Sequence, residues 1–154
     1  MKFIFPLILL GLLGFKKADK TTFSTIRLPV IFFNENSIKY SDKLESNETL
    51  KDTTEMLYFI KSFIEKSPTM TIEIQGHSDF IENNKEDITI KRAEKVCSDL
   101  VKLGIDANRL TIKGFADTKP RMTKKAIDGC KKDKECIKAI RQYNRRVVFK
   151  VTNG

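Results

Sequence analysis

An acidic and a basic side chain occupy positions from which they can flank one pocket. Asp79 ends the segment Gly76-His77-Ser78-Asp79, directly after an alternating apolar stretch, and Arg92 lies in the first turns of a predicted helix. Held close together, they suit a zwitterionic ligand with an ammonium and a carboxylate on one carbon, because each charged end gains a charge-assisted hydrogen bond. A structural ion pair between Asp79 and Arg92, without a ligand, is the alternative.

The elements that position this pair follow from the spacing of apolar residues. Four short segments are typical of strands: 26–33, 70–75, 110–115 and 146–152. Two longer segments repeat apolar residues at three- and four-residue steps, as amphipathic helices do: 47–66 and 87–103. Asn47 is the expected N-cap of the first helix, and Gly104 is expected to end the second. Residues 116–135 are predicted to form a long basic loop before a short helix over 136–142.

Helices of this length between strands imply right-handed crossovers that place both helices on one face of the sheet. The predicted fold class is therefore an α/β (α+β) two-layer sandwich of the βαβαβ type, with the helices packed on one face of a mixed sheet. The last strand is reached through a loop or a short helix, which allows it to run antiparallel to its neighbours.

The first 18 residues are typical of a secretory signal peptide. Lys2 precedes an apolar run of about a dozen residues, which is too short to span a bilayer comfortably. Ala18 and Gly14 are the two candidates for the last residue removed, and an uncleaved membrane anchor is the alternative. Residues 19–25 form a polar lead and residues 26–154 one domain. That domain is predicted to be exported, without a membrane span once the signal is removed.

The composition indicates a globular domain with a basic surface. The chain has 154 residues, of which 40% are hydrophobic and 32% charged, and its formal net charge is +9. Without the first 18 residues, 26 basic residues stand against 20 acidic ones. Such a surface favours anionic partners such as a cell-wall polymer, lipid headgroups or nucleic acid, and charge alone does not choose among them.

The cysteines agree with export, since an oxidising compartment permits disulfides. Cys130 and Cys136 enclose five residues, a loop short enough for one disulfide to staple, and this pairing is predicted. A small metal site is the rival hypothesis, but His77 is the only histidine and zinc usually takes four nitrogen or sulfur ligands, so no metal is expected. Cys97 lies on the apolar stripe of the second helix and is predicted to be a buried free thiol.

Three motifs in sequence order carry a family resemblance: Gly76-His77-Ser78-Asp79, then Ile88-Thr89 shortly before Arg92-Ala93, and finally Asn144-Arg145-Arg146-Val147. Together with the βαβαβ pattern, they resemble the OmpA-like peptidoglycan-binding domain over nearly all of the chain after its first segment. The resemblance implies a module that binds peptidoglycan non-covalently through diaminopimelate, the diamino acid of the stem peptide. It would tether the outer envelope or a partner protein to the cell wall, in the periplasm or at the outer membrane of a Gram-negative-type bacterium.

The resemblance also assigns the two central ligand contacts. Asp79 would bind the ammonium of diaminopimelate, and Arg92 would meet its carboxylate. Thr89 belongs to the same helix motif and is included among the candidate ligand-binding residues. An arginine of the third motif would also hold the ligand, and alternation along a strand allows only one of Arg145 and Arg146 to face it.

Two asparagines are further candidates for the ligand pocket. Asn34 and Asn36 follow the first predicted strand, where similar residues of the family contribute to the pocket. Turn formation explains them equally well, because asparagine bonds its own backbone readily.

No enzymatic activity and no cofactor are expected. His77 beside an acid can act as a general base, but no nucleophile motif or second histidine accompanies it, and in the family this histidine is structural. Peptidoglycan is the expected partner, envelope proteins are possible further partners, and nucleic acid is not expected.

Two departures from the family pattern bear on ligand binding. The position seven residues before Arg92, usually asparagine, is Lys85, and the loop from Asp79 to Arg92 is shorter than in the family. Lys85 can pair with Asp79 and compete with the ligand ammonium. It therefore supports a second hypothesis, a degenerate member that acts as an envelope protein–protein scaffold without binding the ligand. A third, an exported hydrolase with Asp79 or His77 as base, lacks a paired nucleophile or second carboxylate motif.

Overall fold

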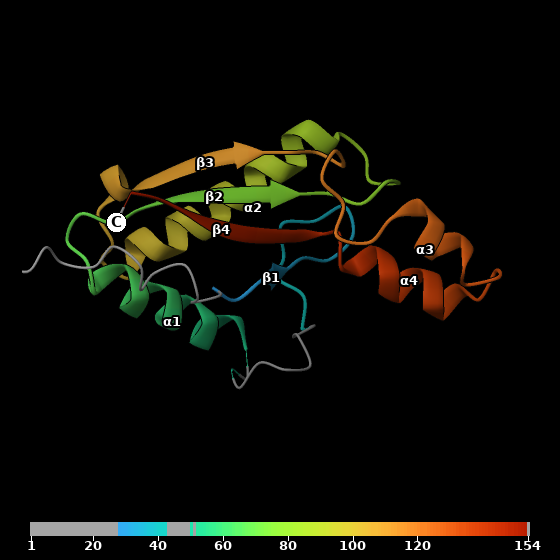
Figure 1. Cartoon of the computed structure of the whole chain (residues 1–154), viewed down its shortest axis with the longest axis horizontal. Coiled ribbons are helices and arrows are strands. Elements are labelled where there is room, and N and C mark those ends of the chain that lie inside the picture. The colour runs from blue at the N-terminus through green and yellow to red at the C-terminus, as the bar shows by residue number, and fades with distance from the viewer. Residues whose placement is uncertain (1–27, 43–49, 51, 154) are drawn as a thin grey trace, which may run out of the picture.

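The computed structural model describes residues 28–42, 50 and 52–153. Its centre is a sheet with the strand order β1-β4-β2-β3. The strands are β1 (Ile31–Phe32), β2 (Thr71–His77), β3 (Leu110–Gly114) and β4 (Arg146–Asn153). β2 and β3 are parallel, whereas β4 runs antiparallel to both β1 and β2 (Figure 1). The mixed sheet is therefore as predicted, and the last strand takes the antiparallel direction that the sequence allowed.

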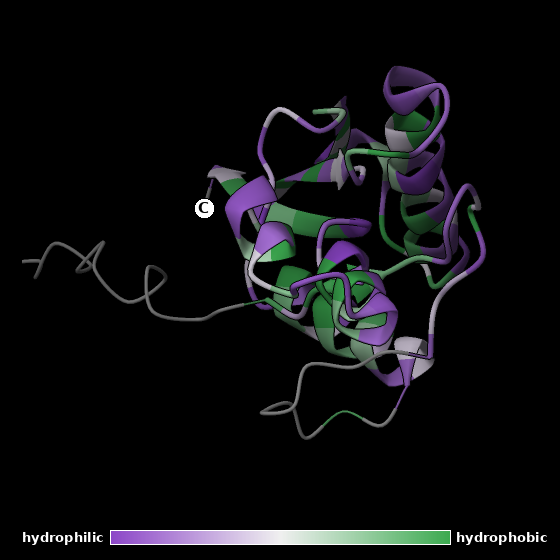
Figure 2. Ribbon diagram, turned by 90° about the vertical axis from the view of Figure 1, so that its right-hand side faces the viewer, coloured by the Kyte–Doolittle hydropathy of each residue, from purple (hydrophilic) through white to green (hydrophobic). Residues whose placement is uncertain are grey.

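Two helices pack against one face of this sheet: α1 (Thr53–Glu65) and α2 (Lys85–Lys102). On β2, Ile72 and Ile74 are fully buried, and the residues that alternate with them are only partly buried. Apolar side chains of both helices join Ile72 and Ile74 in a single core cluster, and apolar segments gather where helices and sheet meet (Figure 2). This arrangement confirms the predicted two-layer α+β sandwich.

The start of α1 differs from the prediction. Asp52 is its N-cap, and the Asp52 carboxylate accepts a hydrogen bond from the Glu55 backbone N–H at 2.9 Å. Asn47, the predicted cap, lies outside the described residues, and Leu50 precedes the helix. A carboxylate at this position satisfies an orphan N–H group and also suits the positive end of the helix dipole.

The end of α2 is as predicted. Gly104 adopts a φ of +100°, a left-handed conformation that side chains disfavour. The N–H groups of Gly104 and Ile105 donate to the carbonyls of Val101 and Leu100, at 2.9 and 3.1 Å. These two hydrogen bonds form a Schellman motif, which closes the last turn of the helix.

Gly76 allows α2 to lie directly on β2. A Cβ atom at Gly76 would lie 1.9 Å from the Thr89 carbonyl oxygen, and one at Gly114 on β3 would lie 2.7 Å from Thr89 Oγ1. Thr89 is fully buried, and its hydroxyl donates to the Glu86 carbonyl at 3.0 Å. Thr89 thus fixes the contact between helix and sheet, while its predicted role toward a ligand stays a prediction.

The first strand is shorter than predicted. β1 comprises only Ile31–Phe32, extended by an isolated bridge between Phe33 and Tyr40. Pro29 has no N–H group to donate to a neighbouring strand. Residues 26 and 27 of the predicted strand, like the predicted signal peptide over 1–18 and the lead over 19–25, lie outside the described residues.

The segment predicted as one long loop contains helical structure. It includes α3 (Lys124–Asp128), and α4 (Lys134–Gln142) begins two residues before the predicted short helix. The predicted disulfide between Cys130 and Cys136 is present and joins the end of α3 to α4. Both helices lie beyond the carboxyl ends of β2 and β3 (Figure 1). Cys97 is a free thiol as predicted, but it is only partly buried.

Over residues 28–42 and 52–153, no helix has the length and apolar character needed to cross a membrane.

Gly76→Ala is expected to destabilise the fold by about 2–3 kcal/mol or more, because the added methyl group collides with helix backbone rather than with a movable side chain. Urea unfolding followed by circular dichroism measures this change. Gly129→Ala is the control, since its new Cβ would lie 3.2 Å from the Ala126 carbonyl oxygen and in the ordinary helical φ region. Equal losses in both variants would contradict the proposed role of Gly76.

Candidate ligand-binding site

Arg92 is fully buried, and each of its five N–H groups has an acceptor. Nη1 and Nη2 both donate to the Glu82 carboxylate. The remaining donors reach three backbone carbonyls, namely His77 from Nη1 at 3.2 Å, Asn34 from Nη2 at 3.0 Å and Ser37 from Nε at 3.1 Å. One guanidinium therefore ties the loop after β1 to the end of β2 and to the loop before α2.

Glu82 is the buried partner of Arg92, and sequence reasoning missed it. Its carboxylate also accepts the backbone N–H groups of Asn36 at 2.8 Å and Asp79 at 3.0 Å. Four hydrogen bonds satisfy both oxygens of a side chain that is closed to solvent. The available signal was one acid three residues after Asp79, in a loop rich in polar residues, which is too common a feature to single out.

Asp79 is fully buried but incompletely hydrogen-bonded. Oδ1 accepts the Phe80 N–H at 2.7 Å, whereas Oδ2 has no hydrogen-bond donor within the described residues. The charges nearest to Oδ2 are Arg145 Nη1 at 3.5 Å and Arg141 Nε at 3.8 Å, and these two nitrogens also lack hydrogen-bond partners. The direct ion pair between Asp79 and Arg92 that the sequence allowed is not formed.

Alternation along the chain separates the two arginines of the third motif. Arg145 lies beside Asp79, and its Nη1 is also 3.7 Å from the exposed carboxylate of Glu35. Arg146 points to the other face of the sheet, where it donates to the carbonyls of Lys119 and Asn144 at 3.1 and 3.4 Å. Arg145 is therefore the arginine that accompanies Asp79.

In this cluster, burial and the neighbouring charges shift the pKa values in opposite directions. It raises the pKa of Asp79 above the ordinary value of 3.8, while the Phe80 N–H, Arg145 and Arg141 act in the opposite direction. Burial likewise lowers the pKa of Arg145, against the attraction of nearby carboxylates. A charged group that supplies a hydrogen bond to Asp79 Oδ2 would stabilise the ionised carboxylate.

Asn34 and Asn36 both shape the loop after β1. The Asn34 side chain is exposed and donates to the Tyr40 carbonyl at 3.1 Å. Asn36 has a φ of +47°, and its side-chain oxygen accepts the Asn83 N–H at 2.9 Å. Asn34 thus stabilises its own loop, whereas Asn36 joins that loop to the one before α2, and direct contact of either with a ligand stays a prediction.

Lys85 does not approach Asp79 as the sequence suggested. Its ammonium pairs with Asp117 at 2.7 Å, which lowers the pKa of Asp117 through that hydrogen bond. The expected competition between Lys85 and a ligand ammonium is therefore wrong in this structure. Lys85 is held toward the loop after β3 instead.

His77 is a buried, neutral ring. It stacks on Phe115 with 5.3 Å between the ring centroids, and neither of its nitrogens has a hydrogen-bond partner in the described part of the chain. Burial, with Arg146 and Lys119 nearby, lowers the pKa of His77 to about 3. A general base works best with a pKa near the working pH, so these surroundings favour packing over catalysis.

The described residues contain no group of three or more His, Cys, Asp or Glu side chains that could hold a metal ion.

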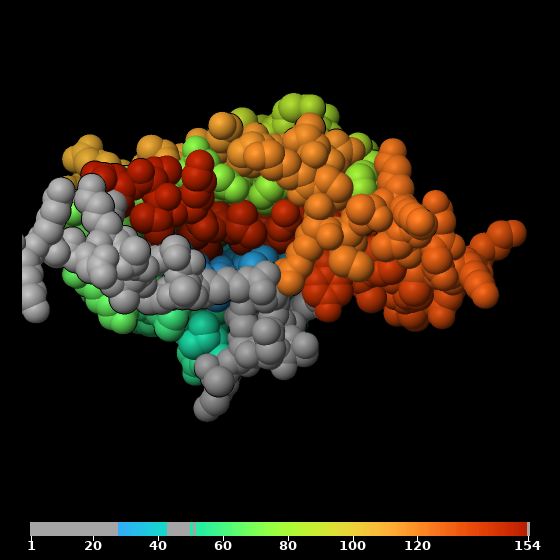
Figure 3. Space-filling model, in the orientation of Figure 1, coloured from blue at the N-terminus to red at the C-terminus, as the bar shows by residue number. Residues whose placement is uncertain are grey.

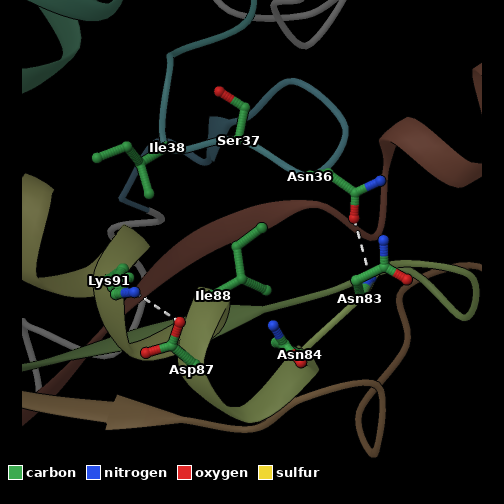
Figure 4. Close-up of a pocket in the computed structure, with 8 residues that line it drawn as sticks. All are labelled: Asn36, Ser37, Ile38, Asn83, Asn84, Asp87, Ile88 and Lys91. Atoms are coloured by element: carbon green, nitrogen blue, oxygen red, sulfur yellow. Dashed lines mark hydrogen bonds and ion pairs between the residues drawn. The ribbon is translucent and has the colours of Figure 1, made fainter.

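A pocket of about 420 Å³ opens beside the Glu82–Arg92 pair, between the loop after β1 and the start of α2 (Figure 4). Its lining residues come from these two regions: Asn36, Ser37, Ile38, Asn83, Asn84, Asp87, Ile88 and Lys91. Lys91 and Asp87 form an ion pair at 2.7 Å on its helical side. Arg92 and Glu82 hold the backbone of Ser37 and Asn36, so the same pair fixes one wall of the pocket.

Altogether, the cluster brings together three carboxylates and three guanidinium groups: Glu35, Asp79, Glu82, Arg92, Arg141 and Arg145. The Glu82–Arg92 pair is fully hydrogen-bonded, whereas the group around Asp79 is not. Such a cluster can offer an acceptor to an ammonium and donors to a carboxylate at neighbouring positions.

The chain belongs to the OmpA family, whose model matches residues 42–134. The resemblance to the OmpA-like domain is thereby confirmed. No curated protein sequence matches the chain significantly.

Several solved structures share the fold. The peptidoglycan-associated lipoprotein from Burkholderia pseudomallei is 21% identical with a TM-score of 0.59, over 79% of this chain and 90% of that one. The C-terminal domain of Helicobacter pylori MotB is 18% identical with a TM-score of 0.54, over 81% and 84%. The OmpA-like domain of FopA1 from Francisella tularensis is 18% identical with a TM-score of 0.52, over 81% and 73%. At these identities the likeness concerns the fold.

Arg92→Met is expected to lower the free energy of unfolding by about 3–5 kcal/mol, because it leaves the Glu82 carboxylate buried without its counter-charge. Urea unfolding at neutral pH measures the loss. Arg141→Met is the control, since Arg141 is 28% exposed and a partly solvated pair contributes little. Comparable losses in the two variants would show that the Glu82–Arg92 pair is not the structural centre.

The fold is expected to lose stability as the pH falls below about 6.5, because unfolded His77 then takes up a proton that the folded ring resists down to about pH 3. The unfolded state binds more protons in this window, so acid favours unfolding. His77→Phe should weaken this dependence when urea midpoints are compared at about pH 7 and about pH 4.5. Asp79, whose raised pKa acts with the opposite sign, is common to both proteins. An unchanged pH dependence would contradict a neutral, buried His77.

Proposed function

We propose that this domain binds peptidoglycan non-covalently, through the diaminopimelate of the stem peptide. Asp79 accepts the ligand ammonium at Oδ2, and Arg145 donates to the adjacent carboxylate. Membership of the OmpA family supports a wall-binding role, and one relative of the same fold is named as peptidoglycan-associated. The function needs no catalytic group.

The observation that carries this proposal is the unfilled hydrogen bonding of Asp79. A buried carboxylate oxygen without a donor is costly, and here it lies 3.5 Å from a guanidinium nitrogen that has no hydrogen-bond partner either. A ligand with an ammonium and a carboxylate on one carbon supplies both missing partners. Arg141, whose side chain is 28% exposed, can swing aside to admit the ligand.

Arg92 supports the site by holding its walls in place. The family pattern implies a contact between this arginine and the ligand carboxylate, but its five donors already have acceptors. Such a contact requires the ligand to displace Glu82 or a carbonyl. We therefore assign the carboxylate to Arg145 and give Arg92 the role of a positioning residue.

A second candidate function is an envelope protein–protein scaffold that has lost ligand binding. Occupation of Arg92 by the internal carboxylate of Glu82 is the observation that favours it. Lys85, the residue from which this hypothesis arose, pairs with Asp117 and no longer supports it.

The biological role that fits wall binding is a tether between the cell wall and the outer envelope or a partner protein. This role places the domain in the periplasm, at the outer membrane of a Gram-negative-type bacterium. It agrees with the basic composition of the chain and with the disulfide between Cys130 and Cys136.

Asp79→Asn is expected to weaken cosedimentation with diaminopimelate-type peptidoglycan by about tenfold or more, because the amide retains the Phe80 hydrogen bond but loses the charge. Asp117→Asn, which also removes an ion-paired carboxylate, is the matched control and should bind like the wild type. Both variants are first checked for an unchanged melting temperature. If all three proteins pelleted equally, recognition of diaminopimelate by Asp79 would be contradicted, and the scaffold function would be favoured.

Peptidoglycan binding is also expected to weaken on acidification at a higher pH than an ordinary aspartate would give. Burial raises the pKa of Asp79, so the carboxylate is protonated before the pH reaches 3.8 and can no longer hold an ammonium. Cosedimentation across mildly acidic pH measures the midpoint, with Asp79→Asn as the reference. A wild-type profile parallel to that of the variant would contradict the assignment.

A further inference from the structure

We infer that the segment Lys119–Gln142 is a second contact surface for the same polymer, one that binds carboxylates of neighbouring stem peptides. This segment, called the basic lobe below, contains α3, α4 and the disulfide. The inference rests on the proposed function, because it takes peptidoglycan as the partner.

The basic lobe concentrates the positive charge of the chain. Its 24 residues include nine lysines and arginines and three acids, so it carries six of the nine net positive charges. Six of its lysines are exposed and form no ion pair within the described residues: Lys124, Lys125, Lys131, Lys132, Lys134 and Lys138. Asp133 forms no ion pair with them within the described residues, and its carboxylate caps α4 by accepting the N–H groups of Glu135 and Cys136.

The basic lobe is an ordered structure, which distinguishes it from a solvated loop. The buried Asn144 anchors its start by accepting the N–H groups of Arg121 and Met122 and donating to the Met122 carbonyl, each at 2.8 Å. The disulfide between Cys130 and Cys136 closes its tip. A short disulfide loop limits the freedom of the charges that it carries, so less entropy is lost when they bind a polymer.

Two lysines stand at the tip in an unusual backbone conformation. Lys131 and Lys132 have φ values of +48° and +72°. Glycine or asparagine is the usual residue in this region, because other side chains are strained there. Both positions carry a lysine instead, and both side chains are exposed to solvent.

The basic lobe continues directly from the proposed ligand site. Arg141 on α4 is 3.8 Å from Asp79 Oδ2, and Lys124 on α3 lies 5.3 Å from the centroid of the Phe80 ring. From there the lobe projects beyond the sheet (Figure 3). A polymer whose stem peptide occupies the Asp79 site would therefore pass the exposed lysines with its next stems.

The surface chemistry favours this polymer over a lipid bilayer. The large exposed apolar residues of the described chain are Ile38, Tyr58, Phe59, Ile81, Ile90, Val101 and Ile112, and all lie outside the lobe. A lobe with charge but no large exposed apolar side chain has little of the apolar face that membrane-surface helices insert. Stem peptides of peptidoglycan carry free carboxylates, which match the lysines.

The test compares two pairs of substitutions that remove equal charge. Lys131→Gln with Lys132→Gln neutralises the two lysines of the tip, and Lys66→Gln with Lys150→Gln neutralises two exposed lysines, one directly after α1 and one on β4. Each purified protein is titrated with diaminopimelate-type sacculi and with sacculi whose carboxylates have been amidated. At about 0.1 M salt the tip variant should bind native sacculi about tenfold more weakly than wild type, and the difference should shrink at about 1 M salt.

Amidation should weaken wild type more than the tip variant, and the α1–β4 variant should follow wild type throughout. Equal binding by the tip variant and wild type, or equal losses in both double variants, would overturn the inference. So would a tip variant that binds sacculi normally but no longer floats with vesicles of phosphatidylethanolamine and phosphatidylglycerol, which would assign the lobe to lipid.

Asp79→Asn, measured beside them, separates the two proposals. If it loses binding while the tip variant does not, the second contact surface fails and the diaminopimelate site stands. If only the tip variant loses binding, the diaminopimelate site fails and the lobe remains the contact with the wall.

Discussion

The buried ion pair between Arg92 and Glu82 is the constraint on which the functional end of this domain depends. Removing two such charges from water costs several kcal/mol per ion, and only complete hydrogen bonding recovers that cost. Here every N–H of the guanidinium and both carboxylate oxygens are used. The partners are mostly backbone groups, so the pair fixes the course of three separate chain segments.

Asp79 is positioned as a consequence of that pair. Its backbone N–H is one of the four donors to Glu82, which leaves its carboxylate directed to Arg145 and Arg141 without a hydrogen bond at Oδ2. The site thus contains two parts. The Glu82–Arg92 pair is fully hydrogen-bonded and positions the loops, whereas Asp79 keeps an acceptor that can bind a ligand. Outside it, the basic lobe adds long-range attraction for an anionic polymer, which an enclosed neutral cluster cannot supply.

Local sequence patterns predicted much of the fold, but they did not predict the ion pairs between side chains of the site. Apolar periodicity found β2, α2, β3 and β4, and Gly104 marked the end of α2, because these signals are local in sequence. Arg92 was expected to meet a ligand carboxylate, with Asp79 as its partner only in the alternative without a ligand, since nothing in a polar loop reveals that Glu82 turns inward. Lys85 meets Asp117 across 32 residues of chain. β1 pairs with β4 through Ile31 and Phe32 alone, and Pro29 just before it has no N–H group to donate. α3 is too short to show a period.

The most direct test is a crystal structure of the domain with a stem peptide that ends in diaminopimelate. We expect the ligand ammonium within about 3 Å of Asp79 Oδ2, the ligand carboxylate on Arg145, and the Glu82–Arg92 pair unchanged. A ligand that displaces Glu82 from Arg92 would contradict the division between a positioning pair and a recognising group. A ligand confined to the pocket between Asn36 and Lys91, without contact to Asp79, would contradict the site itself.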